Sequence, residues 1–132
     1  MNVEGQKQYK EAIDAFKEGL KTDPVNSGLY SGLAECYVDT NEYDIAIMYS
    51  KMALDNAVSK EEKLIATGII AYAYSMNEDY NSAIGYHKEL LEEDSKNRDN
   101  FFNYIISCYY FFWSIWRQRI NTRKVNYVNF FF

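Results

Sequence analysis

Three stretches of this sequence repeat one pattern, beginning at Tyr9, Tyr43 and Tyr80. In each stretch an alanine follows the tyrosine by three residues, and an isoleucine follows that alanine directly. The steps between the equivalent alanines are 34 and 37 residues, at Ala12, Ala46 and Ala83. Self-similarity at this period predicts a solenoid, in which each unit packs only against its neighbours. A solenoid uses an extended concave surface, so binding is favoured over catalysis.

The first stretch has the spacing of an amphipathic helix. Tyr9, Ala12, Phe16 and Leu20 recur at helical intervals and fall on one face, while charged residues cover the other. Pro24 follows, and the residue before a proline disfavours the α region, so this helix should end soon after Leu20. The single proline of the chain leaves long stretches free to be helical.

The region 27–40 carries a second pattern, with Tyr30, Leu33, Ala34 and Tyr37 at i, i+3, i+4 and i+7. It resembles the first-helix pattern W-x2-L-G-x2-Y of the tetratricopeptide repeat family. The alternation Tyr43-x2-Ala46-x3-Ser50-x2-Ala53 is then similar to the second-helix pattern of that family, with serine where an aromatic residue is usual. In the first-helix pattern Ala34 stands in place of the glycine, and a small residue is needed there because a neighbouring helix crosses closely.

The next unit follows the same plan. Ala71 and Tyr74 are in first-helix register, and Tyr80, Ala83 and His87 are in second-helix register. Ser59 and Glu62 form a candidate capping box at its start, and Asn26 or Ser27 is the candidate cap one unit earlier.

The resemblance implies an all-α fold, an antiparallel helix-turn-helix solenoid of about two and a half repeats plus a C-terminal apolar helix. Residues 1–98 would form the repeats. Residues 1–26 would be a partial repeat, and residues 27–60 and 61–97 would each be a full one. Residues 99–132 would form an aromatic-rich helix or tail, or a partial fourth repeat. Phe101, Tyr104 and Ile105 would face inward in that fourth unit. The helix at 8–22 lacks a hairpin partner. The residues expected to pack the repeats are Tyr9, Ala12, Phe16, Tyr30, Leu33, Ala34, Tyr37, Tyr43, Ala46, Ala53, Ala71, Tyr74, Tyr80 and Ala83.

Charge divides the chain near residue 100. Residues 1–99 carry ten basic and 19 acidic side chains, a net charge of −9, whereas residues 100–132 carry four basic and no acidic ones. The net charge of −5 disfavours nucleic acid as a partner, because such binding needs a basic face. Cys36 and Cys108 have neither a metal-site spacing nor a disulfide framework, which favours a reducing, cytoplasmic setting.

The segment 100–116, NFFNYIISCYYFFWSIW, is apolar and aromatic almost throughout. Three interpretations stay open: a terminal helix whose surplus apolar face drives self-association, aberrant translated sequence such as a frame change, and an anchor on a membrane surface. For the anchor, the basic residues that follow would lie at lipid headgroups. A spanning helix needs about 20 apolar residues, so an interfacial segment is favoured over a span.

The sequence contains no recognisable catalytic constellation, and we expect no enzyme activity, no cofactor and no metal. His87 is the single histidine and replaces a packing aromatic in the repeat register, so a structural role is expected. Cys36 and Cys108 are expected to be small buried hydrophobes. The run Glu92-Glu93-Asp94 is expected to be a solvated helix end.

By family resemblance the first helices line the concave groove. The candidates for contact with a partner are Ser31, Glu35, Val38 and Asp39 from one repeat and Ile65, Gly68, Tyr72, Ser75 and Met76 from the next. Some family members hold a peptide's terminal carboxylate with Lys, Arg and Asn at such positions, and none of these nine positions has those residues. An extended or helical segment with apolar side chains is therefore expected, with a basic residue facing Glu35 and Asp39. The alternative is that these positions bind nothing.

The sequence thus predicts a non-catalytic protein-interaction scaffold that binds a peptide or partner helix. A membrane-associated adaptor held by residues 100–116 and the following basic residues is one alternative, and a fragment of a larger array is another. Because about three repeats are needed for stability, we also expect a homo-oligomer.

Overall fold

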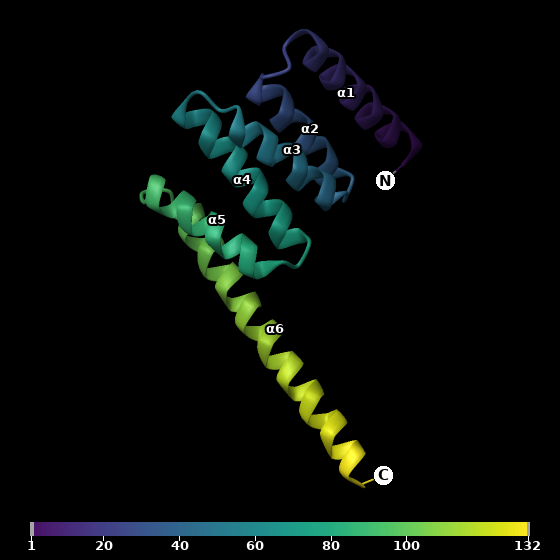
Figure 1. Cartoon of the computed structure of the whole chain (residues 1–132), viewed down its shortest axis with the longest axis vertical. Coiled ribbons are helices and arrows are strands. Elements are labelled where there is room, and N and C mark those ends of the chain that lie inside the picture. Colours follow the sequence, from purple (N-terminus) through teal and green to yellow (C-terminus); the bar gives the residue numbers. More distant parts are fainter. Residues whose placement is uncertain (1, 132) are drawn as a thin grey trace.

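A computed structural model shows a chain of helices stacked side by side (Figure 1). It describes the backbone of residues 2–131 and the side chains of residues 2–123. The described residues form six helices and no strand, so the all-α solenoid expected from the repeats is confirmed. The helices are α1 (Val3–Thr22), α2 (Ser27–Asp39), α3 (Tyr43–Asp55), α4 (Lys60–Met76), α5 (Tyr80–Glu93) and α6 (Arg98–Phe131).

Each helix from α2 onward packs against the helices before and after it in the chain, and α2 also contacts α4. Short turns join the helices, and two of these turns use the left-handed region at Asn41 and Glu78, with φ values of 63° and 62°. These two residues occupy equivalent places, each just before a second helix of a hairpin. Asparagine tolerates this backbone conformation better than glutamate does.

The helix starts follow from local capping. The Asn26 side chain accepts a hydrogen bond from the Leu29 backbone N–H at 3.1 Å and caps α2. Ser27 instead donates its hydroxyl to the Ala53 carbonyl at 2.8 Å and ties α2 to α3. Of the two candidate caps, Asn26 is therefore the one used.

Ser59 caps α4 by accepting a hydrogen bond from the Glu62 N–H at 3.1 Å. The Glu62 carboxylate accepts from the Val58 N–H at 2.9 Å rather than from Ser59. The expected capping box therefore spans one residue more than its usual pattern. The backbone N–H groups of Glu62 and Val58 each have a side-chain acceptor.

Small residues allow the helices to approach closely. Five of the alanines expected to pack the repeats, Ala34, Ala46, Ala53, Ala71 and Ala83, are fully buried, and Tyr30 and Leu33 are buried with them. The remaining expected packing residues are half-buried: Tyr9, Ala12, Phe16, Tyr37, Tyr43, Tyr74 and Tyr80.

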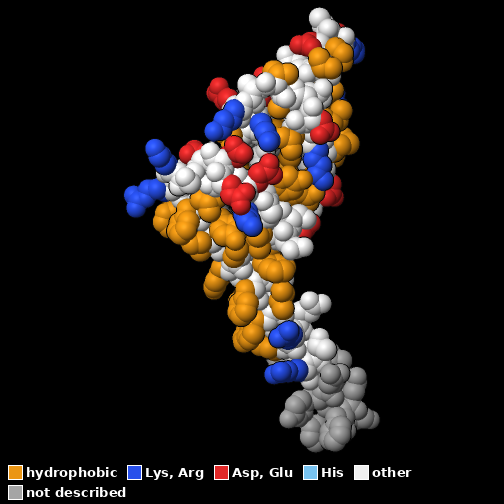
Figure 2. Space-filling model, turned by 60° about the vertical axis from the view of Figure 1, so that its left-hand side comes forward, with side chains coloured by type: hydrophobic (Ala, Val, Ile, Leu, Met, Phe, Trp, Pro, Cys, Tyr) orange, Lys and Arg blue, Asp and Glu red, His pale blue; other side chains and the backbone are white. Residues whose placement is uncertain are grey.

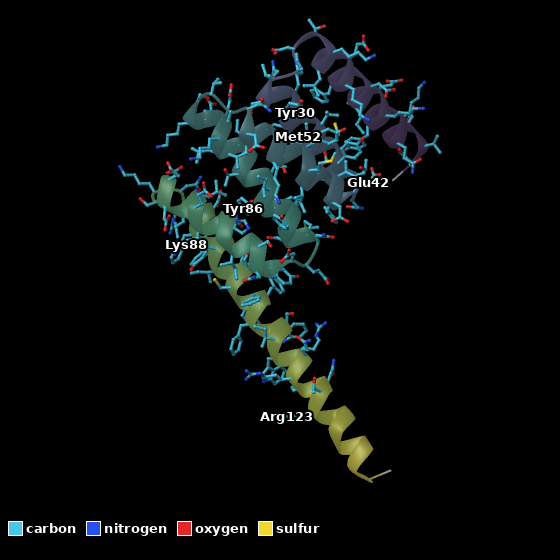
Figure 3. The ribbon with its side chains drawn as sticks, in the orientation of Figure 1. Tyr30, Glu42, Met52, Tyr86, Lys88 and Arg123 are labelled. Carbon is cyan, nitrogen blue, oxygen red and sulfur yellow. The ribbon has the colours of Figure 1, made fainter. Side chains whose placement is uncertain are left out.

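Stacked tyrosines recur between the helices of each hairpin. Tyr37 stacks on Tyr49 with ring centroids 5.6 Å apart, and Tyr74 stacks on Tyr86 at 5.7 Å. Tyr86 of α5 lies between α4 and α5, as Figure 3 shows. Lys51 of the preceding hairpin lies 5.3 Å from the centroid of the Tyr74 ring, which adds a cation–π contact between units.

Helix α1 packs on α2, but none of its residues is buried. In one of its contacts the Phe16 ring lies directly over Gly32 of α2.

Helix α6 is one uninterrupted helix that extends well beyond the other helices (Figure 1). Its inward face differs in part from the one expected. Tyr104 is half-buried as expected, but Phe101 and Ile105 are exposed, and the half-buried Asn100 turns inward with Tyr104. Asn100 donates hydrogen bonds to the carbonyls of Leu90 and Asp94 at the end of α5. These bonds, which a phenylalanine could not make, fix the rotation of α6.

Candidate partner-binding groove

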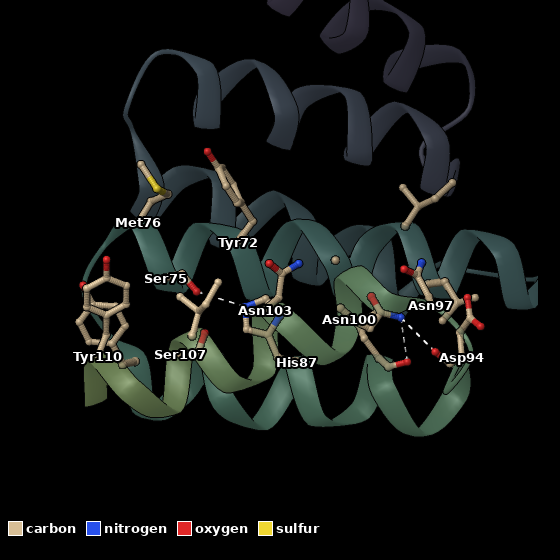
Figure 4. Close-up of a pocket in the computed structure, with 16 residues that line it drawn as sticks. Tyr72, Ser75, Met76, His87, Asp94, Asn97, Asn100, Asn103, Ser107 and Tyr110 are labelled. Carbon is tan, nitrogen blue, oxygen red and sulfur yellow. Dashed lines mark hydrogen bonds between the residues drawn. The ribbon is translucent and has the colours of Figure 1, made fainter. Parts of the chain in front are cut away.

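Helices α4, α5 and α6 enclose an open groove of about 790 Å³ (Figure 4). It exists because α6 packs on α5 while its inner face stays apart from α4. On the α4 side the groove is lined in part by Gly68, which has no side chain to fill it.

One face of α4 forms the first wall. Ile65, Gly68, Tyr72, Ser75 and Met76 all line the groove, so the structure brings together the five candidates from the second full repeat. Ile65, Tyr72 and Met76 are each about half exposed, which leaves apolar surface for a partner. A Cβ atom placed on Gly68 would meet nothing within 4 Å, so the centre of this wall is open.

A row of asparagines at the start of α6 and just before it forms the opposite wall. Asn97, Asn100 and Asn103 follow one another at intervals of three residues and all line the groove. The Asn100 side chain donates its hydrogen bonds to carbonyls at the end of α5, whereas the Asn103 side chain makes no hydrogen bond to any other described residue. A carboxamide both donates and accepts, so Asn103 can hydrogen-bond the backbone of an extended peptide.

The floor of the groove contains His87 of α5, whose side chain is buried. Its Nε2 lies 3.2 Å from the Ser75 hydroxyl, which itself donates to the Ala71 carbonyl at 3.0 Å. The Ser75 oxygen therefore accepts from Nε2–H, and Nδ1 is left as an acceptor. Nδ1 is buried and has no hydrogen-bond partner among the described residues. Burial lowers the pKa of the His87 imidazole below its usual value, so the ring is neutral at pH 7.

The groove is weakly acidic. Asp94 is its one charged lining residue, and no lysine or arginine lines it in the described chain. The repeats around it have an excess of acidic residues. An anionic ligand would meet an unfavourable potential here, and a neutral or cationic segment would meet a favourable one.

The candidates from the first full repeat lie outside this groove. Ser31 is buried and Val38 is half-buried, whereas Glu35 and Asp39 are exposed. Asp39 accepts a hydrogen bond from the Tyr9 hydroxyl at 3.2 Å, and its carboxylate raises the pKa of that tyrosine. These four residues are therefore not brought together with the five on α4 in one cavity.

Sequence reasoning missed the asparagine row. Its three-residue spacing was visible in the sequence, but we expected Phe101, Tyr104 and Ile105 as the inward residues and no contact role for the asparagines. The residues around the asparagines are mostly apolar and aromatic, so no polar face of the helix indicated which side of α6 points inward.

The described residues show no arrangement suited to catalysis at His87, which faces Ser75 but no carboxylate. No three His, Cys, Asp or Glu side chains within that part of the chain are grouped to hold a metal ion. Cys36 is buried, which raises the pKa of its thiol and disfavours the reactive thiolate, and Cys108 is half-buried. No helix between residues 2 and 131 combines the length and apolarity needed to cross a bilayer.

Comparison with known proteins agrees with this architecture. Residues 5–47 match the tetratricopeptide repeat model. No curated protein sequence matches the chain at a significant level.

Several solved structures share the fold. The first tetratricopeptide domain of Spaghetti (RPAP3) bound to the HSP90 peptide SRMEEVD is 20% identical with a TM-score of 0.70, over 78% of this chain and 79% of that one. The first such domain of human RPAP3 is 20% identical with a TM-score of 0.71, over 80% and 81%. The Arabidopsis OM64 domain is 16% identical with a TM-score of 0.68, over 77% and 82%. The chain therefore has the tetratricopeptide fold.

Proposed function

We propose that this chain is a non-catalytic protein-interaction scaffold that binds a peptide segment in the groove between α4 and α6. The observation that carries this proposal is the groove itself, with exposed apolar side chains on α4 facing the asparagine row on α6. Solved relatives in fold support it, since one domain is bound to an HSP90 peptide and the second domain of human RPAP3 is in complex with the HSP70 peptide SGPTIEEVD.

The chemistry of the groove selects a different kind of peptide from those two acidic ones. The groove lining has no lysine or arginine to neutralise an acidic peptide, and Asp94 adds a negative charge that such a peptide would meet. We therefore infer a segment with apolar side chains against Ile65, Tyr72 and Met76, its backbone bonded to Asn103, and a basic residue near Asp94. We propose a cytoplasmic setting for this interaction, which fits the two free cysteines.

A matched pair of glycine substitutions tests the groove. Gly68 and Gly85 are both helical, and a Cβ atom at either would meet nothing within 4 Å, but only Gly68 lines the groove. Gly68→Phe should fill the groove and abolish peptide binding, whereas Gly85→Phe should leave it unchanged. The probes are two fluorescent peptides of equal length with the same leucines, one carrying arginines and the other glutamates.

Binding is measured by fluorescence anisotropy. The arginine peptide should bind the native chain more tightly than the glutamate peptide. Equal affinity for the two peptides, or equal loss of binding in both glycine variants, would contradict the groove as the binding site.

A further inference from the structure

The outer face of α6 carries a second, separate surface. Phe102, Ile105, Tyr109, Phe112 and Trp116 follow one another at alternating steps of three and four residues, and each is between 46% and 71% exposed. This spacing places them in one line along a helix, as in the seam between two packed helices. We call these five residues the outer stripe. Figure 2 shows hydrophobic side chains gathered along this part of the molecule.

Nothing in the described chain covers the outer stripe. The opposite side of α6 faces α5 through Tyr104 and the buried Ser107, and Tyr110 stacks on Tyr80 at 5.5 Å. Beyond this contact α6 continues as one helix to Phe131, so no described segment folds back over the stripe. Its aromatic residues therefore face solvent in a single copy.

The exposed area is large enough for a stable dimer. A large aromatic side chain carries about 200 Å². The outer stripe and its exposed apolar neighbours therefore present roughly 600–800 Å² when about half of each side chain is exposed. A standard interface buries about 800 Å² per partner, and the largest apolar patch on a typical monomer is about 300–600 Å².

Charge shows which way a second copy would lie. Residues 100–123 have no acidic side chain and include Arg117, Arg119 and Arg123, whereas acidic residues end at Asp99. Asp99 and Arg119 each lie ten residues from Tyr109, or about 15 Å along the helix. Both side chains are exposed, and neither forms an ion pair within residues 2–123. Two helices crossing antiparallel at Tyr109 would place each Asp99 beside an Arg119, whereas parallel helices would place arginines together.

We propose that two copies of this chain associate through antiparallel pairing of α6, with the two-fold axis near Tyr109. The outer stripe of each copy covers that of the other, and Asp99 of one copy faces Arg119 of its partner. Such an interface is self-complementary, as a closed two-fold dimer requires. It lies on a different face of α6 from the asparagine row, so it does not depend on the peptide-binding groove.

Light-scattering mass during size-exclusion chromatography of the full chain tests the stripe. The native chain should elute at twice its mass of 15.5 kDa. The double variant Tyr109→Glu, Phe112→Glu should be monomeric with unchanged helicity by circular dichroism. The matched control is Val58→Glu, an exposed apolar residue between α3 and α4, which should remain dimeric. A monomeric native chain, or a double variant that remains dimeric, would overturn the proposal.

Charge exchange tests the orientation without altering the apolar residues. Arg119→Asp should raise the dissociation constant of the dimer about tenfold, because two symmetric attractive pairs become repulsive. Adding Asp99→Arg should restore the native dissociation constant, and failure to restore it would refute the antiparallel arrangement.

A lipid surface is the competing occupant. A native chain that is monomeric in buffer, but co-sediments with phosphatidylcholine–phosphatidylserine vesicles through the outer stripe, would assign the stripe to lipid and refute the dimer.

Discussion

Replacement of glycine by alanine should stabilise the chain at one helical position and fail to stabilise it at another. Gly68 of α4 has open space where a Cβ atom would lie. Gly68→Ala should therefore raise the free energy of unfolding by about 1 kcal/mol, because alanine has a higher helix propensity than glycine. At Gly32 of α2 the same Cβ atom would lie 2.5 Å from two ring atoms of Phe16, against an ordinary carbon–carbon contact of about 3.5–4.0 Å.

The ring of Phe16 must therefore move when Gly32 is replaced. Overpacking of this kind costs about 1–3 kcal/mol, which offsets or exceeds the gain of about 1 kcal/mol in propensity. The free energy of unfolding of Gly32→Ala should thus lie about 1–3 kcal/mol below that of Gly68→Ala. Because the Phe16 ring of α1 rests on Gly32 of α2, this difference measures how firmly α1 is held at this contact.

The assay is equilibrium unfolding in urea followed by far-ultraviolet circular dichroism at one fixed protein concentration. Gly85→Ala is the reference, since its Cβ atom also meets nothing within 4 Å. In a Phe16→Ala background the clash is absent, so Gly32→Ala should become stabilising. If Gly32→Ala stabilises the native chain as much as Gly68→Ala does, the ring of Phe16 does not rest on Gly32 and the reasoning is wrong.

Three further predictions concern single positions. Because the folded-state pKa of His87 is lowered from 6.5, the unfolded chain binds the proton first. The contribution of His87 to the unfolding free energy should therefore be present above pH 6.5 and be lost as the pH falls below it, and His87→Gln should remove this dependence in urea titrations between about pH 5 and 7. Ser27→Ala should lower the unfolding free energy by about 1–2 kcal/mol in the same assay, because the buried Ala53 carbonyl loses its donor. Glu78→Gly should raise the thermal midpoint through a gain of about 1 kcal/mol, since glycine adopts the left-handed backbone at no steric cost; an unchanged midpoint would mean that the turn is not strained.

The positions of the helices could be predicted from the sequence because the patterns that indicate them are local and recur in each repeat. The alanines at 34 and 71 mark close helix crossings, and both are fully buried. Pattern alone also indicated the cap at Ser59 and limited the cap of α2 to Asn26 or Ser27, because short polar side chains before an apolar run favour helix starts.

The rotation of α6 could not be predicted in this way. Its residues are apolar on nearly every side, so hydrophobic periodicity does not distinguish the face that packs on α5 from the outer stripe. Tertiary contacts decide the rotation instead: the hydrogen bonds from Asn100 to the end of α5 and the stacking of Tyr110 on Tyr80. Half of the groove depends on that rotation, and so the asparagine wall emerged only from the three-dimensional arrangement.

The apolar excess of α6 is explained if this one helix serves three surfaces. Tyr104 and Ser107 face α5, the row from Asn97 to Asn103 faces the groove, and the outer stripe faces away from both. An ordinary surface helix needs one apolar stripe, whereas a helix between two packed partners needs two. The groove and the outer stripe are consequently separable by mutation. Gly68→Phe should abolish peptide binding in a chain that still dimerises, and the Tyr109→Glu, Phe112→Glu variant should bind the arginine peptide as a monomer.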